Sequence, residues 1–229
     1  KSCRVLVQPS AIAGKWVLEA GIFNTGAIYR WFKEQYCRDL LDNPRSYIVM
    51  DKEAEDSGPG AHGVMMIPHC EGSAAPYWNP LAKGIFFNLS LGTTRGDMNR
   101  AILEGIAMEI HDCLELIQEL SGTLSTVDVA GGMTKSNLFC KIQADCYGLP
   151  VARYTNSEAS SLGACIVAAP ELGIYDILEQ SYAAMASDID FTFAPDSAHH
   201  ALYEEKIQIK KKLYFSLAEN DVYESFAGK

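Results

Sequence analysis

The stretch 127–145 constrains the fold of this chain more than any other. It reads as a short apolar strand, then Gly131 and Gly132, then a helix that begins near Ser136. A strand that passes into a helix through glycines presents bare backbone N–H groups beside the positive end of a helix dipole, which favours phosphate binding. The segment therefore predicts a nucleotide-binding turn. A double glycine in this position is more often a packing turn, so the surrounding sequence is needed to choose between the two.

Strand and helix patterns alternate along the rest of the chain, which is typical of the α/β class. Helical spacing of apolar residues predicts helices at 25–41, 97–120, 136–147, 160–169, 176–186 and 197–218. Apolar runs predict strands at 3–7, 16–21, 64–68, 84–91, 126–130 and 148–153. The length of 229 residues fits one sizeable domain over 1–229.

Two polar segments are assigned to the surface. The acidic, Gly-Pro-containing stretch 51–60 is interpreted as a mobile surface insertion, with regulatory contacts as the alternative. Lys206, Lys210, Lys211 and Lys212 alternate with apolar residues. They are predicted to form the solvated face of an amphipathic terminal helix rather than a nucleic-acid patch.

Composition excludes several classes of protein. The formal net charge of −10 leaves no basic face for a phosphate backbone, so nucleic acid is not an expected partner. No apolar run approaches the length of a membrane span, so no membrane association is expected. The 7 cysteines form an odd set without a Cys-x-x-Cys pair, which indicates free thiols in a reducing, cytoplasmic compartment. The 5 histidines show no metal-ligand spacing.

The glycine turn is one of four motifs that follow one another in a fixed order and spacing. They are Ala-Pro-Tyr-Trp-Asn-Pro-Leu-Ala-Lys-Gly at 75–84, Leu-Ser-Leu-Gly-Thr-Thr-Arg at 89–95, the turn itself, and the strand and small-residue helix start within 148–165. In this arrangement the chain resembles the carboxy-terminal domain of the FGGY family of carbohydrate kinases, over about residues 14–217. It looks similar to the xylulokinase-like members of the family and also to the autoinducer-2-kinase-like branch. The resemblance implies an actin-like ATPase (ribonuclease-H-like) fold, a mixed sheet flanked by helices.

The resemblance also assigns residues of the glycine turn to a nucleotide. The backbone at Gly132 would face the nucleotide, and Ser136 occupies the position that contacts the adenosine, with Gly131 and Asn137 adjacent. Ser136 has a structural interpretation too, because a serine at a helix start caps the helix. One side chain can serve both roles.

A second nucleotide contact is expected from the helix at 25–41. Its segment Gly-Ala-Ile-Tyr-Arg resembles the one in which the family places a glycine and, four residues later, a polar side chain against the nucleotide. A spacing of four puts Gly26 and Arg30 on one helix face. Glycerol kinases of the family tend to carry glutamine where this chain has Arg30, so a plain surface cation is the competing interpretation.

The resemblance implies ATP-dependent transfer of a phosphoryl group to a hydroxyl of a small sugar or polyol, with a xylulose-like ketose favoured and with ATP and Mg²⁺ as cofactors. The family's sugar pocket and catalytic aspartate lie in or just after the amino-terminal domain, and this chain has no match to them. We therefore expect the nucleotide-binding half of a two-domain kinase, inactive alone. No catalytic residue and no metal ligand is assigned to this chain, and the sugar would bind through the absent domain.

Two other readings are weighed. A non-catalytic nucleotide-binding sensor or scaffold could be built on the same fold, since fold alone does not fix function. A dinucleotide-binding oxidoreductase is disfavoured because Gly131 and Gly132 lack the G-x-G-x-x-G spacing. A homodimer is a candidate assembly.

Overall fold

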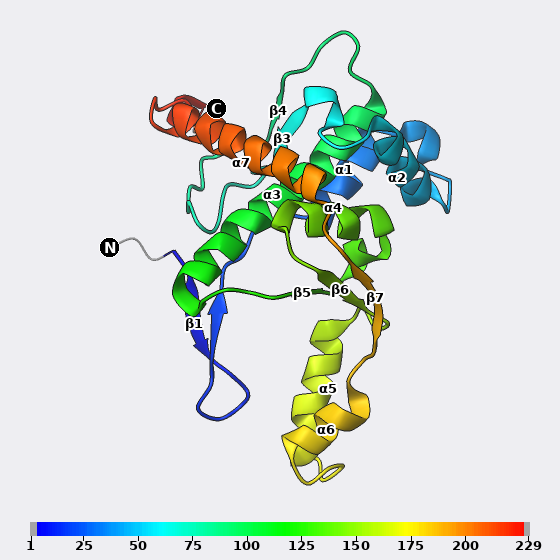
Figure 1. The fold of residues 1–229 in the computed structure, drawn as a ribbon, viewed down its shortest axis with the longest axis vertical. Helices are drawn as coiled ribbons and strands as arrows, with labels where there is room; N and C mark the ends of the chain where they lie inside the picture. Colours follow the sequence, from blue (N-terminus) through cyan, green and yellow to red (C-terminus); the bar gives the residue numbers. More distant parts are fainter. Residues whose placement is uncertain (1–3, 227–229) are drawn as a thin grey trace.

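The computed structural model of the chain describes residues 4–226. Three small sheets and seven α-helices make up this part of the chain, with α7 crossing the helical body and α5–α6 projecting away from it (Figure 1). The strand expected at 3–7 begins at Leu6, and Cys3 lies outside the described residues. The strands are β1 (Leu6–Pro9), β2 (Trp16–Glu19), β3 (Met65–Ile67), β4 (Ile85–Phe87), β5 (Val127–Val129), β6 (Val151–Tyr154) and β7 (Ile189–Phe193). The helices are α1 (Gly26–Tyr36), α2 (Ser46–Ser57), α3 (Arg95–Ser121), α4 (Asn137–Tyr147), α5 (Ala159–Glu171), α6 (Leu178–Met185) and α7 (Ser197–Ala218), with short 3₁₀ turns at Arg38–Leu40, Ala61–Gly63, Gly132–Lys135 and Glu224–Phe226.

The sheet that carries the glycine turn is mixed, as expected. β5 pairs with β6 in parallel, with Val127 opposite Val151, and α4 forms the crossover between them. β7 then pairs antiparallel to β6, with Phe193 opposite Val151. The α/β class and the mixed sheet are confirmed. β7 itself is absent from the predicted elements, although the apolar residues Ile189, Phe191 and Phe193 alternate with polar ones, the pattern of a half-buried strand.

α3 is the central element of the core. It begins at a capping box, in which the Thr94 hydroxyl accepts a hydrogen bond from the Asp97 N–H and the Asp97 carboxylate accepts one from the Thr94 N–H. The helix packs against α1, α2, α4 and β3. It approaches β3 at Gly105, where an added Cβ would lie 2.3 Å from the Met66 carbonyl oxygen. A glycine is therefore required for this helix to lie so close to the strand.

The predicted surface insertion at 51–60 is wrong. Residues 51–57 form the second half of α2, which packs on α3 and buries Met50 and Ala54. The Arg95 guanidinium of α3 pairs with the Glu53 carboxylate of α2. Gly58 is the C-cap of the helix, and only 58–60 form a short turn. The acidic composition belongs to the exposed face, where Lys52 pairs with Asp56 four residues on.

The predicted solvated lysine face of the last helix is wrong for two of its four lysines. Lys206 and Lys210 of α7 are 6% and 1% exposed. The Lys206 ammonium donates to the Gly60 and Val64 carbonyls and lies 3.3 Å from the Glu104 carboxylate of α3. Lys210 is paired with Glu109 and Asp112, also on α3. Lys212 is exposed, as expected.

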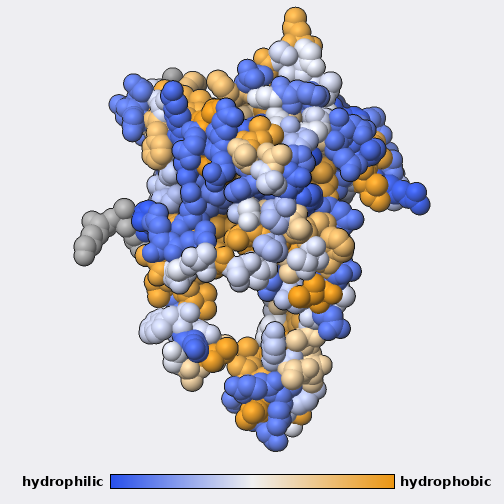
Figure 2. Space-filling view, viewed as in Figure 1, coloured by the Kyte–Doolittle hydropathy of each residue, from blue (hydrophilic) through white to orange (hydrophobic). Residues whose placement is uncertain are grey.

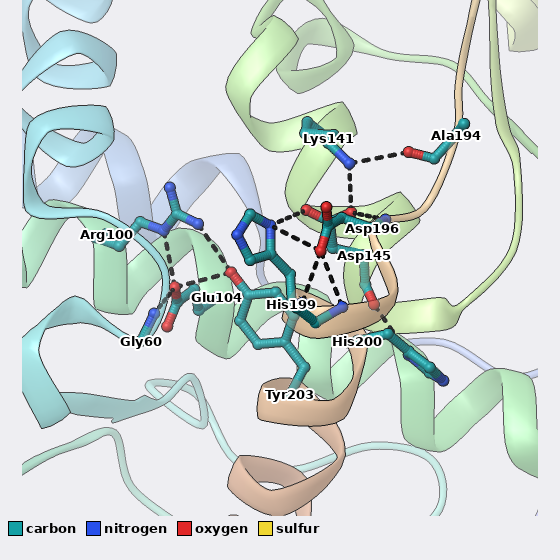
Figure 3. Close-up of polar contacts among 11 residues, drawn as sticks. Gly60, Arg100, Glu104, Lys141, Asp145, Ala194, Asp196, His199, His200 and Tyr203 are labelled. Carbon is teal, nitrogen blue, oxygen red and sulfur yellow. Dashed lines mark hydrogen bonds and ion pairs between the residues drawn. The ribbon is translucent and has the colours of Figure 1, made fainter.

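Figure 3 shows how the first turns of α7 are anchored. The Glu104 carboxylate accepts hydrogen bonds from Arg100 at 2.7 Å and from the Tyr203 hydroxyl of α7 at 2.9 Å. The Asp145 carboxylate of α4 accepts one from the Asp196 N–H at 2.7 Å and lies 3.1 Å from the His199 ring. α7 is therefore joined to α3 by buried polar contacts and to α4 by partly buried ones.

The six cysteines within the described residues are free thiols, four of them buried. Within residues 4–226, no helix combines the length and the apolar character that crossing a membrane requires.

Candidate nucleotide-binding site

A cavity of about 460 Å³ lies where α1, α2 and the turn before α4 meet. This volume is in the range of small-ligand sites. Four of the six residues expected to contact a nucleotide line it: Gly26 and Arg30 from α1, and Gly132 and Ser136 from the glycine turn. The two segments are about a hundred residues apart in the sequence, so their meeting is a property of the fold.

The glycine turn brings backbone and a helix start to this cavity. Gly131 has a φ of +100°, a conformation that favours glycine, and its N–H donates to the Ser157 carbonyl. Gly132 has open space where a Cβ would be. Ser136 is the N-cap of α4, and its Oγ accepts a hydrogen bond from the Phe139 N–H at 3.0 Å. The expected capping role of Ser136 is confirmed.

α1 also starts at this cavity. Its first two residues, Gly26 and Ala27, line the cavity, and the N-cap Thr25 makes no side-chain hydrogen bond to the helix end. A Cβ on Gly26 would lie 3.4 Å from the Met133 side chain, so the two segments are in direct contact here. The N-termini of α1 and α4 therefore face one cavity, and both dipoles favour negative charge there.

Asp51 of α2 connects the two segments, although the local sequence pattern does not mark it. Its Oδ1 accepts a hydrogen bond from the buried Tyr29 hydroxyl of α1 at 2.9 Å. Burial raises the pKa of the Asp51 carboxyl, and hydrogen bonds from Ser136 and Tyr29 partly offset that rise. Three elements thus meet at one carboxylate.

The basic side chains that line the cavity are exposed, whereas its acidic side chain is partly buried. Arg30 and Lys135 line the cavity and are exposed, while Asp51 is partly buried and is the single acid among the lining residues. Two cations and two helix N-termini make this opening favourable to an anion on a chain whose net charge is −10.

Two of the six expected residues lie outside the cavity lining. Gly131 sets the geometry of the turn, as described above. The Asn137 side chain faces the other way, with its Oδ1 accepting a hydrogen bond from Arg153 at 2.7 Å. Asn137 therefore supports the turn against β6 in this structure.

Comparison with known proteins identifies the family. The sequence model for the C-terminal domain of the FGGY family of carbohydrate kinases matches residues 4–171, well over half of the chain.

The chain belongs to the FGGY family.

Similar proteins in sequence are glycerol kinases. The FGGY chain is 34% identical over 177 residues to the glycerol kinase of Saccharolobus islandicus strain L.S.2.15, covering 77% of this chain and 34% of that protein. It is 36% identical over 165 residues to the glycerol kinase of Citrifermentans bemidjiense, covering 72% and 32%. The chain thus spans about a third of the length of these relatives.

Solved structures support the fold of the FGGY domain. A ligand-bound xylulose kinase from Lactobacillus acidophilus matches with a TM-score of 0.83 at 20% identity, over 98% of this chain and 44% of that chain. A Plasmodium falciparum glycerol kinase with ADP matches with a TM-score of 0.72 at 23% identity, over 96% and 42%. The actin-like fold expected from the sequence is confirmed.

A larger cavity of the FGGY domain, about 650 Å³, lies between the β1–β2 hairpin and α5–α6. Figure 2 shows it as an opening between these two projecting parts. None of the six expected nucleotide residues lines it. Apolar side chains such as Ile12, Leu162 and Val167 dominate its walls, and no lysine or arginine is among its lining residues, so it is not suited to a triphosphate.

Metal binding has one geometric candidate among the described residues. His111, Asp112 and Glu115 of α3 offer ligand atoms within 4.8 Å of one another. The ammonium groups of Lys210 and Lys211 already lie at 2.7 Å from Asp112 and 2.6 Å from Glu115. These cations occupy the place that a metal would take, so no metal ligand is assigned here.

Proposed function

We propose that this chain is the nucleotide-binding half of an ATP-dependent carbohydrate kinase. It binds ATP with Mg²⁺ in the cavity between α1, α2 and α4, and a hydroxyl of a small sugar or polyol receives the γ-phosphoryl group. The observation that carries the proposal is the convergence of Gly26 and Arg30 with Gly132 and Ser136 on one cavity.

Each cavity residue has a role that follows from its chemistry. Gly26 and Gly132 present backbone without a side chain, so a phosphate can approach the N–H groups at two helix starts. Arg30 and Lys135 add positive charge at the exposed edge. Ser136 keeps the first turn of α4 in place by capping it.

The chain contributes binding and orientation to the reaction rather than proton transfer. Phosphoryl transfer depends mainly on in-line positioning and on charge stabilisation. Asp51 is the one carboxylate that lines the cavity, and it already accepts a hydrogen bond from the Tyr29 hydroxyl. We therefore assign it neither the role of general base nor that of metal ligand. Mg²⁺ supplies charge neutralisation when it arrives with the ATP phosphates. We place the base and the sugar pocket in a domain outside this chain.

The acceptor is proposed as a small polyol or ketose. The similar sequences are glycerol kinases, whereas the similar structures include xylulose, gluconate and glycerol kinases. The relatives therefore do not support the specific preference for xylulose expected from the sequence. Structural similarity at below 25% sequence identity supports the fold only. The relatives found by sequence therefore guide the choice of acceptor, and glycerol is the first to test.

The decisive experiment is a calorimetric titration of this chain with ATP and Mg²⁺. Gly132→Val is the test variant, because open space around Gly132 lets the protein fold while the added side chain fills the edge of the cavity. Gly21→Val is the matched control, since Gly21 also has open space and lies outside the cavity. We expect Gly132→Val to weaken ATP binding about tenfold or more, and Gly21→Val to leave it unchanged.

Three outcomes would oppose the proposal. Absence of ATP binding, or binding that Gly132→Val does not affect, would remove the nucleotide site from this cavity. Glycerol- or xylulose-dependent release of ADP by this chain alone would contradict the placement of the base in another domain.

A further inference from the structure

Asp51 is a carboxylate in an unusual position for a site that binds a polyanion. It lines the cavity, its Oδ1 accepts a hydrogen bond from Tyr29 at 2.9 Å, and among the described residues no lysine or arginine forms an ion pair with it. Burial raises the pKa of this carboxyl, and only the hydroxyls of Ser136 and Tyr29 oppose that rise. A partly buried carboxylate without a cation is stabilised by any further hydrogen-bond donor that enters the cavity.

The position of Asp51 decides which part of a nucleotide it meets. Phosphates carry the negative charge, so they are placed at the exposed edge beside Arg30 and Lys135 and away from a carboxylate. Asp51 lies with the buried Tyr29 on the inner side, where the fully buried Leu103 and the partly buried Met133 supply apolar walls. The uncharged, flat base is the part of a nucleotide that fits such walls.

We propose that the Asp51 carboxylate accepts a hydrogen bond from the exocyclic 6-amino group of adenine and thereby makes this site select adenine nucleotides. The inference rests on the proposed function, because it concerns the same cavity. An ionised carboxylate only accepts hydrogen bonds, and adenine presents a donor at position 6 where guanine presents an acceptor. A carboxylate can also hold the paired N–H donors of guanine, so GTP is compared directly with ATP in the test.

The test is a double-mutant-type cycle, in which the 6-amino group of the ligand and the Asp51 carboxylate are removed singly and together and the binding affinity is measured. ATP is compared with purine riboside triphosphate, which lacks any 6-substituent, in titrations of the wild-type chain and of Asp51→Ala and Asp51→Asn. Asp56→Ala is the matched control, because Asp56 is an exposed acid on the same helix and pairs with Lys52 outside the cavity. Urea unfolding of each variant checks that the fold is intact. A pairwise contact appears as non-additivity of the two changes.

In the wild-type chain we expect ATP to bind about tenfold more tightly than the analogue, as for a hydrogen bond to a charged group. Asp51→Ala should bind both equally, and Asp56→Ala should keep the tenfold preference. In Asp51→Asn the amide can present its N–H₂ group, so the preference for ATP should shrink.

The failures are distinguishable. If ATP binds to the wild-type chain with no preference over the analogue, or if Asp51→Ala keeps the preference, the role of Asp51 is wrong and the nucleotide site stands. If GTP binds more tightly than ATP, the adenine assignment is overturned. If 2′-deoxy-ATP or 3′-deoxy-ATP, rather than the 6-position analogue, shows the coupling to Asp51, the carboxylate contacts ribose and the base assignment is wrong. If no nucleotide binds, both proposals fall.

Discussion

The Lys210 ammonium of α7 lies 2.8 Å from the Glu109 carboxylate of α3, and the two side chains are 1% and 2% exposed. Asp112 shares the same ammonium at 2.7 Å, and the Met108 carbonyl accepts from it at 3.1 Å. Two carboxylates and one ammonium at this depth are tolerated only together, because each would be costly to bury alone.

Lys210→Met should therefore destabilise the chain by about 3–5 kcal/mol, since it removes one partner of a buried ionic cluster. The measurement is the free energy of unfolding in urea. Lys212→Met is the control, because Lys212 is exposed on the same helix and should change the stability by less than about 0.5 kcal/mol. Equal effects of the two substitutions would contradict the structural role of Lys210.

The stability should also fall in acid. Burial raises the pKa of Glu109, but the Lys210 charge and the hydrogen bond from His69 outweigh it and hold the pKa at about 2, below its ordinary value of 4.5. A carboxyl with a lowered folded-state pKa stabilises the protein fully above its unfolded pKa, and this is lost as the pH falls from about 4.5 towards about 2. The loss is about 3 kcal/mol at most. Unfolding free energies measured across this window should show it, and Glu109→Gln should flatten the dependence.

Two glycines in helices should respond in opposite directions to alanine. A Cβ on Gly105 would lie 2.3 Å from the Met66 carbonyl oxygen, so Gly105→Ala must push α3 away from β3 and should cost more than about 2 kcal/mol. Gly163 of α5 has open space at that point, so Gly163→Ala should stabilise by about 0.5–1 kcal/mol through helix propensity. The midpoint of thermal unfolding of each variant, compared with the wild-type chain, tests the two predictions. Destabilisation by both would mean that α5 is packed more closely than the structure shows.

Loss of the N-terminal cap of α3 should lower the stability by a smaller amount. Thr94→Ala removes the side-chain acceptor for the Asp97 N–H and should cost about 1 kcal/mol. Thr123→Ala is a suitable control, since Thr123 is exposed and follows the end of the same helix. If urea midpoints shift equally for the two variants, the capping box does not stabilise the helix.

The elements that carry the family motifs could be predicted from the sequence because their signals are local. The strand at 127–129, the capped helix at 137–147 and the long helix at 95–121 each combine a clear period with a recognisable end. The four predicted nucleotide contacts that line the cavity were assigned by position, through a resemblance. Their meeting in one cavity needed the structure.

The errors arose where tertiary contacts override composition. The stretch 51–60 was assigned to the surface for its acids and its Gly-Pro pair, yet Met50 and Ala54 bury one face of α2, and the glycine marks its end. Asp51 has no local signal, because its partners Tyr29 and Ser136 lie on other elements. Likewise, Lys210 resembles any surface lysine until α3 is placed beside it.

The match to the family covers residues 4–171, whereas the lysines that pair with Glu104 and Glu109 lie on α7 at Ser197–Ala218. A fragment cut at the edge of the match would retain these acids and lose their lysines. We therefore expect the unit that folds to extend beyond the residues that the family model matches. Among relatives, an α3 acid and its α7 lysine are expected to be lost or kept together, so covariation between the two helices would trace the true extent of the domain.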